Sequence, residues 1–336
     1  MIESLPINGM KDCLLSNKKM TEREGLPDFI IGGAAKCGTT SLHNILASRE
    51  DVFIPEGEVH FFSMGDFVQA RGTVRYDPER TLFDLESDKK VEWYRSFFEP
   101  AREDQLIGED STVYLSSRVA PERIKEALPD VKLIFMLRNP VDRAYSHYWH
   151  QVNSGRATTR FEQELIHGPT HIHTRGFYKG QLERYLDLFP HDQIKVVLFE
   201  RFIEETQSVV DEVCSYLGLQ GTVDIDEIQS HSNASSCPRW LGVYLTLNYV
   251  LKGLEGRIYR SHWPGEPSEE LLSENDTGKR LLRNILYALR ARIPRTDSYP
   301  PMDESVRERL TQLYARENQG LGEMIDADLE TYWPFT

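Results

Sequence analysis

Continuous apolar runs alternate with amphipathic stretches along much of the chain. Residues 27–33, 131–137 and 194–199 are short runs that are apolar except for Asp28, Lys132 and Lys195, and such runs are typical of strands buried on both faces of a parallel sheet. Residues 39–48 and 204–217 have the spacing of helices that follow the first and the last of these strands. This alternation predicts an α/β fold, in which helices flank a parallel sheet on both faces.

The segment after 131–137 predicts where the next helix begins. Asn139 is a favourable N-cap residue, and Pro140 suits the first helical position because no N–H is needed there. Residues 155–176 are rich in Gly, Thr and His, and we expect a long loop in this region.

The C-terminal part of the chain is expected to be helical. Amphipathic helices are predicted at 240–259 and 277–293, with a polar linker at 264–276, and one or two further helices over 306–329. The aromatic and aliphatic positions of 240–259 indicate a core helix or a face between two copies of the chain.

Length and composition indicate one large globular domain. The 336 residues are 40% hydrophobic and 27% charged, which is ordinary for a soluble domain with a single core. We expect residues 1–25 to form a loosely ordered leader, because they contain no apolar run typical of a signal peptide or a membrane anchor, and residues 26–336 to form the domain. The four cysteines lie far apart, which favours a reduced, cytoplasmic protein; they are Cys13, Cys37, Cys214 and Cys237.

The formal net charge of −14 limits the classes of partner. A nucleic acid or a heavily sulfated glycan would be repelled unless a local basic patch outweighed the overall field. Neutral or cationic partners are favoured, and neither nucleic acid nor a membrane is expected.

The stretch from Gly32 to Leu42 predicts a binding site for a phosphate or sulfate group. A strand runs into a turn of small residues and then into a helix, so several backbone N–H groups converge beside the positive end of the helix dipole. Lys36 adds a charge, and hydroxyl donors follow it at Thr39, Thr40 and Ser41. The alternative is an ordinary glycine turn with a solvated lysine.

This loop differs from that of nucleoside triphosphatases. Their loop places Lys after Gly and before a Ser or Thr that reaches Mg²⁺, whereas Lys36 precedes Gly38. The strand at 131–137 ends in Arg138, which supplies positive charge without a metal. An ATP-dependent small-molecule kinase or another P-loop nucleotide-binding protein stays open as an alternative, and dependence on magnesium would separate the two.

Four stretches together resemble the sulfotransferases that use 3′-phosphoadenosine-5′-phosphosulfate, especially the heparan sulfate branch and its bacterial relatives. They are Ala-Lys-Cys-Gly-Thr-Thr-Ser at 35–41, Glu-Gly-Glu-Val-His-Phe-Phe at 56–62, Leu-Arg-Asn-Pro-Val-Asp-Arg-Ala-Tyr-Ser at 137–146 and Tyr-Pro-Pro-Met-Asp at 299–303. The resemblance implies a P-loop-like sulfotransferase fold. It also implies transfer of a sulfuryl group from this donor to a hydroxyl or amine, with 3′,5′-adenosine bisphosphate as product and no metal required.

The resemblance also assigns donor-binding residues. The first stretch would hold the 5′-phosphosulfate, through Lys36, Cys37, Gly38, Thr39, Thr40 and Ser41. The third would hold the 3′-phosphate through Arg138 and Ser146, and a guanidinium at a strand end can donate two N–H groups to a phosphate. Arg295 is a further candidate, although the Lys-Gly-Arg of the heparan branch is replaced here by Arg-Thr-Asp at 295–297.

Glu58 matches the glutamate proposed as general base in the heparan sulfate enzymes. The Phe61–Phe62 pair follows it, and a carboxylate beside aromatic rings is expected to have a raised pKa and to accept protons more readily. His60 is either a substrate-side helper or alternative base, or a structural histidine. An intact Glu58 counts against a non-catalytic binder that only retains the donor site.

Asp110 departs from the heparan pattern and bears on the acceptor. It stands where that branch has the lysine of Glu-Lys-Ser or Glu-Lys-Thr, so a basic residue on the substrate side is replaced by an acidic one. We therefore expect a small neutral or cationic acceptor, such as a natural product with a guanidinium group, and not a sulfated glycan.

The histidines outside these stretches have simpler interpretations. His167, His171 and His173 lack the cysteines or regular spacing of a zinc site, so we expect them to be loop residues. His147 and His150 are expected to flank the donor-binding helix or to face solvent.

Overall fold

The computed structural model describes residues 25–63, 87–168, 171–223, 236–254 and 277–333. The predicted leader lies almost wholly outside these residues. The polar linker at 264–276 and the last part of the helix expected at 240–259 also lie outside them.

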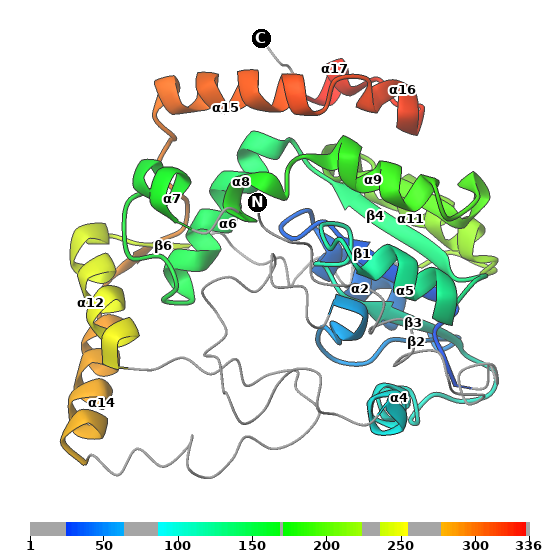
Figure 1. Ribbon diagram of the computed structural model, residues 1–336, viewed down its shortest axis with the longest axis horizontal. Helices are drawn as coiled ribbons and strands as arrows, with labels where there is room; N and C mark the ends of the chain where they lie inside the picture. Colours follow the sequence, from blue (N-terminus) through cyan, green and yellow to red (C-terminus); the bar gives the residue numbers. More distant parts are fainter. Residues whose placement is uncertain (1–24, 64–86, 169–170, 224–235, 255–276, 334–336) are drawn as a thin grey trace, which may run out of the picture.

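A parallel sheet forms the centre of the described residues, as Figure 1 shows. Its order is β2-β3-β1-β4-β5, and every neighbouring pair is parallel. The strands are β1 (Phe29–Gly33), β2 (Val52–Phe53), β3 (Leu106–Asp110), β4 (Lys132–Leu137) and β5 (Ile194–Leu198). The predicted α/β class is therefore confirmed, together with the three strands expected from the apolar runs.

Helices cover the sheet and enclose its core. β1 is buried at all of its positions, which explains its unbroken apolar sequence. The main core joins the sheet to helices before and after each strand. These helices are α2 (Thr39–Ala47), α4 (Ser87–Ser96), α5 (Ala120–Ala127), α9 (Tyr178–Leu186), α10 (Phe199–Glu204) and α11 (Thr206–Leu217), with the short 3₁₀ turns η1 (Phe61–Ser63) and η2 (His191–Gln193).

A second core lies beside the sheet and is organised around α6 (Pro140–Asn153). The predicted cap is present, because the Asn139 side chain accepts hydrogen bonds from the N–H groups of Val141 and Asp142. Trp149 of α6 is buried and stacks on Tyr299 with ring centroids 5.3 Å apart. The other elements around α6 are α12 (Leu241–Leu254), α15 (Glu304–Glu317) and the antiparallel pair β6 (Cys237–Pro238) and β7 (Arg295–Thr296).

The prediction of a long loop at 155–176 is wrong. The region contains two short helices, α7 (Phe161–His167) and α8 (His171–Thr174). Both are held by contacts that the local sequence does not reveal, because Phe161 and Ile172 are buried in the second core. The buried Glu164 carboxylate accepts hydrogen bonds from the N–H groups of Thr158 and Thr159, at 2.9 and 3.0 Å, and so fixes the turn before α7.

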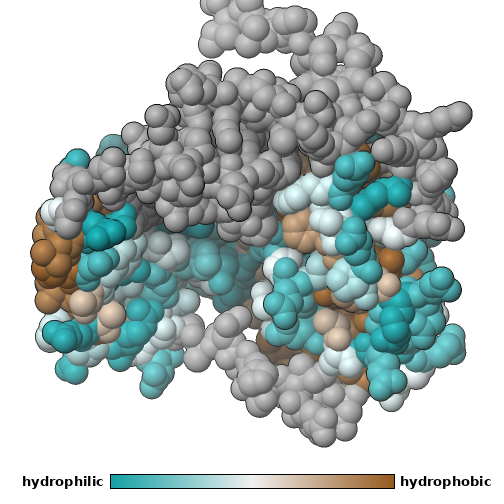
Figure 2. All heavy atoms as spheres, turned by 90° about the horizontal axis from the view of Figure 1, so that it is seen from below, coloured by the Kyte–Doolittle hydropathy of each residue, from teal (hydrophilic) through white to brown (hydrophobic). Residues whose placement is uncertain are grey.

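The C-terminal helices agree with the prediction and leave an apolar row exposed. They are α14 (Thr277–Ala291), α15, α16 (Leu321–Ile325) and α17 (Leu329–Tyr332). On α14, Leu281, Ile285 and Leu289 are 62%, 48% and 48% exposed, and Figure 2 shows apolar side chains gathered along this edge. A contact between two copies of the chain through residues 240–259 stays a prediction. No helix in the described part of the chain combines the length and the apolar character needed to cross a bilayer.

Candidate active site

The site lies where the chain leaves the sheet in opposite directions. β1 and β4 are neighbours, but the chain passes from β1 to β2 on one side of the sheet and from β4 to β5 on the other. Such a switch point leaves a crevice outside the carboxyl ends of the two strands, where ligands of open parallel sheets bind. The predicted phosphate loop follows β1, and Arg138 follows β4, so both reach this crevice.

The loop from β1 to α2 turns its backbone toward the crevice. Lys36 has φ +73° and Gly38 has φ +87°, and such alternating turns direct successive N–H groups to one side. The first N–H groups of α2 have no acceptor within the helix. The Ala34 N–H is bonded to the Met136 carbonyl at 2.7 Å, which ties the loop to β4.

Cys37 points away from the crevice. Its thiol is fully buried 3.8 Å from the Tyr178 hydroxyl, and burial raises its pKa to about 11. Its N–H is bonded to the Ala34 carbonyl at 3.2 Å. Cys37 therefore packs the loop, whereas Thr40 and Ser41 are exposed at the start of α2.

Three cations surround the loop. Arg138 lies with a guanidinium nitrogen 3.5 Å from the Lys36 carbonyl, and its guanidinium stacks 4.7 Å from the centre of the Phe199 ring. Burial, and then the charge of Arg138, lower the pKa of Lys36. Arg143 is completely buried on α6, where one nitrogen donates to the Ile172 carbonyl. Ser146 is buried one turn further along α6.

These cations leave positive charge without a matching carboxylate. Across the described ranges, Lys36, Arg138 and Arg143 form no ion pair, and the Nε and Nη1 atoms of Arg143 have no hydrogen-bond partner. An isolated buried charge is costly, so a group of such charges fits an anionic ligand. The residues present therefore fit the phosphates and the sulfate of the donor that the sequence suggests.

Glu58 faces the same region from the segment between β2 and η1. The Thr112 hydroxyl donates to its two carboxylate oxygens at 2.8 and 3.0 Å, and His60 Nε2 lies 3.0 Å from Oε2. Burial alone would raise the pKa of Glu58, but the hydrogen bond and charge of His60, with the Thr112 hydroxyl, lower it below its ordinary value. The raised pKa expected from the neighbouring phenylalanines is therefore wrong, because the polar partners outweigh the apolar ones.

Arg175 is a cation that the sequence indicates only as part of a basic patch, with Arg156 and Arg160, which could guide an anion. It is 9% exposed, and its positive charge contributes to the lowered pKa of Glu58. It follows α8, in the region expected to be a loop.

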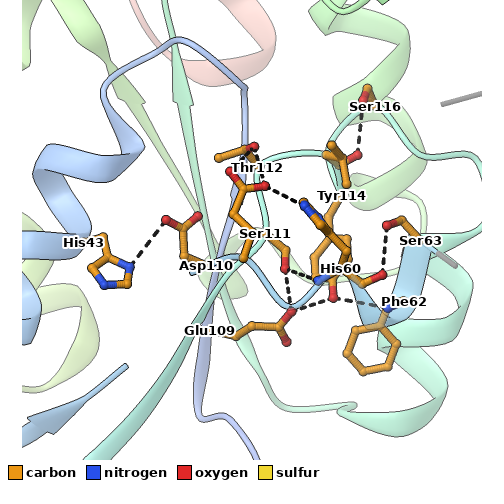
Figure 3. A network of polar contacts seen from close by, with 12 residues as sticks. His43, His60, Phe62, Ser63, Glu109, Asp110, Ser111, Thr112, Tyr114 and Ser116 are labelled. Carbon is orange, nitrogen blue, oxygen red and sulfur yellow. Dashed lines mark hydrogen bonds and ion pairs between the residues drawn. The ribbon is translucent and has the colours of Figure 1, made fainter. Parts of the chain in front are cut away.

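A buried carboxylate supports the segment that carries Glu58. Glu109 of β3 is completely buried and accepts hydrogen bonds from the hydroxyls of Tyr94, Ser111 and Tyr114. Figure 3 shows the bonds from Ser111 and Tyr114. In the sequence, Glu109 was only the first residue of Glu-Asp-Ser-Thr, where the heparan branch has Glu-Lys-Ser or Glu-Lys-Thr. Ser111 and Tyr114 follow it closely in the chain, and the fold brings Tyr94 of α4 to it.

Asp110 is next to Glu109 and is only 5% exposed. Its Oδ2 lies 3.4 Å from His43 Nδ1, and its Oδ1 has no hydrogen-bond partner (Figure 3). Burial raises the pKa of Asp110, and the negative charge of Glu58 adds to the rise, although His43 opposes it. The carboxyl thus lies within electrostatic reach of Glu58.

Arg295 and the remaining histidines have structural partners. Arg295 donates to Asn153 Oδ1 at 2.7 Å and to Ser236 Oγ at 3.1 Å, so it joins β7 to the end of α6. His147 is buried and bonded to Gln151 at 3.0 Å, and its ring contacts that of His171, whereas His150 is exposed. Within the residues that the structure describes, no group of three or more His, Cys, Asp or Glu side chains is arranged to hold a metal.

Comparison with known proteins gives one consistent family. Residues 27–224 match the model of the sulfotransferase family. Heparan sulfate glucosamine 3-O-sulfotransferase 6 of Homo sapiens is 30% identical over 208 residues, which are 60% of this chain and 55% of that protein. Bifunctional heparan sulfate N-deacetylase/N-sulfotransferase 1 of Mus musculus is 29% identical over 230 residues, 62% of this chain and 24% of that protein. The chain thus spans about half, or less, of the length of these curated relatives.

Among solved structures, a sulfotransferase from Alicyclobacillus acidocaldarius superposes with a TM-score of 0.62 at 27% identity, covering 91% of this chain and 98% of that one. The predicted sulfotransferase fold and the resemblance on which it rested are confirmed.

Gly38→Ala tests whether the loop needs its present shape for binding. The two residues Gly38 and Gly218 have φ +87° and +85°, so an alanine at either costs about 1–2 kcal/mol of backbone strain. Only at Gly38 would the new Cβ meet another group, the Phe199 ring at 2.8 Å, which supports Arg138. We expect both variants to lose stability in thermal unfolding, but only Gly38→Ala to weaken binding of 3′,5′-adenosine bisphosphate in calorimetry. Equal affinities of the two variants would contradict this role of the loop.

Proposed function

The chain belongs to the sulfotransferase family, and on that premise we propose that it transfers a sulfuryl group from 3′-phosphoadenosine-5′-phosphosulfate to a hydroxyl or amine of an acceptor. The observation that carries the proposal is the group of cations without carboxylate partners at the ends of β1 and β4, beside the ionisable pair Glu58 and His60. Family membership and the order of Lys36 before Gly38 favour this donor over ATP, and so decide against the kinase alternative.

The donor site is built from two segments in this proposal. Lys36, the backbone of the loop and the hydroxyls at the start of α2 hold the 5′-phosphosulfate, while Arg138 and Ser146 hold the 3′-phosphate. When bound, the donor supplies the sulfuryl group, whose bond to the phosphate breaks as the bond to the acceptor forms. Lys36 and the loop N–H groups stabilise the negative charge left on the phosphate, and such preorganised electrostatics is usually a large part of catalysis.

Glu58 accepts the proton of the acceptor. Its lowered pKa keeps the carboxylate ionised at neutral pH, so it is ready to act as a base. His60 holds the carboxylate from one side and Thr112 from another, which leaves it in one orientation toward the crevice. Thr112 is therefore a positioning residue for the base.

We propose that the acceptor is a small molecule that is neutral or cationic. The net charge of −14 and the unpaired Oδ1 of Asp110 near Glu58 support a cationic acceptor group. Arg175 acts in the opposite direction, since its charge also reaches Glu58. We also propose that the protein works in the cytoplasm, which the three buried free thiols of the described residues support; they are Cys37, Cys214 and Cys237.

The 3′-phosphate assignment is tested with the bisphosphate product. A charge-assisted, bidentate contact is worth about 1.5–3 kcal/mol, so 3′,5′-adenosine bisphosphate should bind roughly tenfold or more tightly than 5′-AMP. Arg138→Met should remove most of this difference in calorimetry. If wild-type protein bound the two nucleotides equally, Arg138 and Ser146 would not hold a 3′-phosphate.

Lys36→Ala and Glu58→Gln should separate donor binding from proton transfer. Lys36→Ala should weaken binding of the bisphosphate and remove most activity, because the lysine contacts the donor's phosphate. Glu58→Gln should retain bisphosphate affinity and lose turnover of a hydroxyl acceptor. Near-normal turnover in Glu58→Gln would mean that another group, with His60 the first to test, is the base.

The acceptor class is tested by comparing substrates. We expect sulfuryl transfer from labelled donor to small amines, alcohols or phenols, and poor transfer to heparan oligosaccharides. Asp110→Asn should raise KM for a cationic acceptor more than for a neutral one, because a contact with a carboxylate is lost. Efficient turnover of the oligosaccharide would show that Asp110 does not face the acceptor.

A further inference from the structure

We propose that Glu109 is a positioning residue, which fixes the backbone of residues 60–62 through three hydroxyl-bearing neighbours and thereby holds His60 against Glu58. This inference rests on the proposed function, in which Glu58 accepts the acceptor's proton. Glu109 itself is completely buried, and its carboxylate accepts hydrogen bonds from Tyr94, Ser111 and Tyr114.

Three branches lead from Glu109 to three consecutive residues, and Figure 3 shows the two that reach His60 and Phe62. The Ser111 hydroxyl donates to Glu109 Oε1 at 2.8 Å and accepts from the His60 N–H at 2.9 Å. The Tyr114 hydroxyl donates to the same oxygen at 2.5 Å and accepts from the Phe62 N–H at 3.1 Å.

The third branch is apolar at its far end. The Tyr94 hydroxyl donates to Glu109 Oε2 at 2.6 Å, and the ring of Tyr94 stacks on Phe61 with centroids 4.4 Å apart. One carboxylate therefore orients the supports of His60, Phe61 and Phe62 together.

The direction of the hydrogen bonds makes Glu109 necessary for this arrangement. Ser111 and Tyr114 each have one hydroxyl proton, and both give it to Glu109 Oε1. Their lone pairs then face the N–H groups of His60, which is partly buried, and of Phe62, which is buried, and satisfy both. Burial raises the pKa of Glu109, whereas the three hydroxyl donors oppose that rise. Because both relays use Oε1, a proton on Oε2 would leave them intact.

His60 requires such support because its backbone is strained. Its φ is +59°, in the left-handed region that non-glycine residues seldom adopt. The Ser111 hydroxyl holds its N–H, and Ser63 holds its carbonyl through a hydroxyl at 3.0 Å. In this conformation the imidazole Nε2 lies 3.0 Å from Glu58, and this contact lowers the pKa of Glu58.

The effect of breaking the His60 branch on pH dependence follows from this contact. Ser111→Ala removes the acceptor of the His60 N–H and loosens the imidazole. An interaction that favours the charged form of Glu58 is then weakened, so the pKa of Glu58 rises. A base must be deprotonated to act, and therefore the acid limb of the kcat profile moves to higher pH. At a fixed pH on that limb, kcat falls several-fold, while the affinity for 3′,5′-adenosine bisphosphate is unchanged.

The experiment measures kcat against pH with a hydroxyl acceptor in wild type, Ser111→Ala, Glu109→Gln and Glu109→Ala. Glu109→Gln should retain the wild-type profile, since its amide oxygen can accept at the Oε1 position and its NH₂ can face Tyr94. Glu109→Ala should behave like Ser111→Ala or worse. Tyr185→Phe is the matched control, because it removes a buried hydroxyl bonded to the Tyr114 carbonyl at 2.8 Å without reaching residues 60–62. It should lower Tm as Ser111→Ala does and leave the acid limb in place.

Two results separate failure of this inference from failure of the proposed base. If Ser111→Ala lowered Tm like Tyr185→Phe but left the acid limb unmoved, while Glu58→Gln was inactive, the network would be structural only. If Glu58→Gln stayed active, the base assignment would fail. The positioning role of Glu109 would then be tested by titrating the His60 ring, observed by NMR in histidine-labelled protein. A changed His60 titration in Ser111→Ala, with none in Tyr185→Phe, supports positioning by the network. An unchanged His60 titration in Ser111→Ala overturns the proposal. This test does not need Glu109→Ala, so it holds even if that variant does not fold.

Discussion

The site depends on the point in the sheet where the chain leaves the neighbouring strands β1 and β4 in opposite directions. Because these neighbouring strands continue to opposite sides of the sheet, the crevice between them is left to the loop after β1 and to Arg138 after β4. The loop can enter that space only with a left-handed turn at Gly38, where Phe199 leaves no room for a side chain. The same phenylalanine stacks on Arg138, so the shape of the loop and the position of the cation are set by one packing contact.

The buried cations of the site destabilise the folded protein when no anion is bound. Arg143 is buried without a carboxylate among the described residues, and burial lowers the pKa of Lys36, so both groups raise the free energy of the empty protein. An anion bound beside Lys36 would reduce the cost of burying that lysine. Glu109 differs from these cations, since its three hydroxyl donors offset part of the cost of burying its carboxyl group.

Features that depend on local chemistry could be predicted from the sequence. The apolar strands, the cap at Asn139 and the loop around Lys36 follow from residue type and spacing, and the structure has them where they were expected. Helices α7 and α8 were missed because buried Phe161 and Ile172, not a helical repeat, hold them. The pKa shift of Glu58 was predicted in the wrong direction, because the hydrogen bond and charge of His60, and then the hydroxyl of Thr112 from a distant segment, outweigh burial. The role of Glu109 was overlooked because the orientation of its hydroxyl partners toward residues 60–62 depends on the fold.

The short contact between Glu58 and His60 changes how the base should be understood. Glu58 takes the proton of an acceptor while its Oε2 lies 3.0 Å from His60 Nε2, so the imidazole acts directly on the carboxylate that serves as base. His60 can donate to Glu58 while the carboxylate is charged, and that hydrogen bond weakens once Glu58 is protonated. The pair therefore stabilises the charged carboxylate before proton transfer and lowers its basicity, which favours acceptors whose proton is already acidified as the bond to sulfur forms. A base of this kind needs exact orientation more than a high pKa, and the hydrogen bonds from Thr112 to Glu58 and from Ser111 to the His60 backbone supply that orientation.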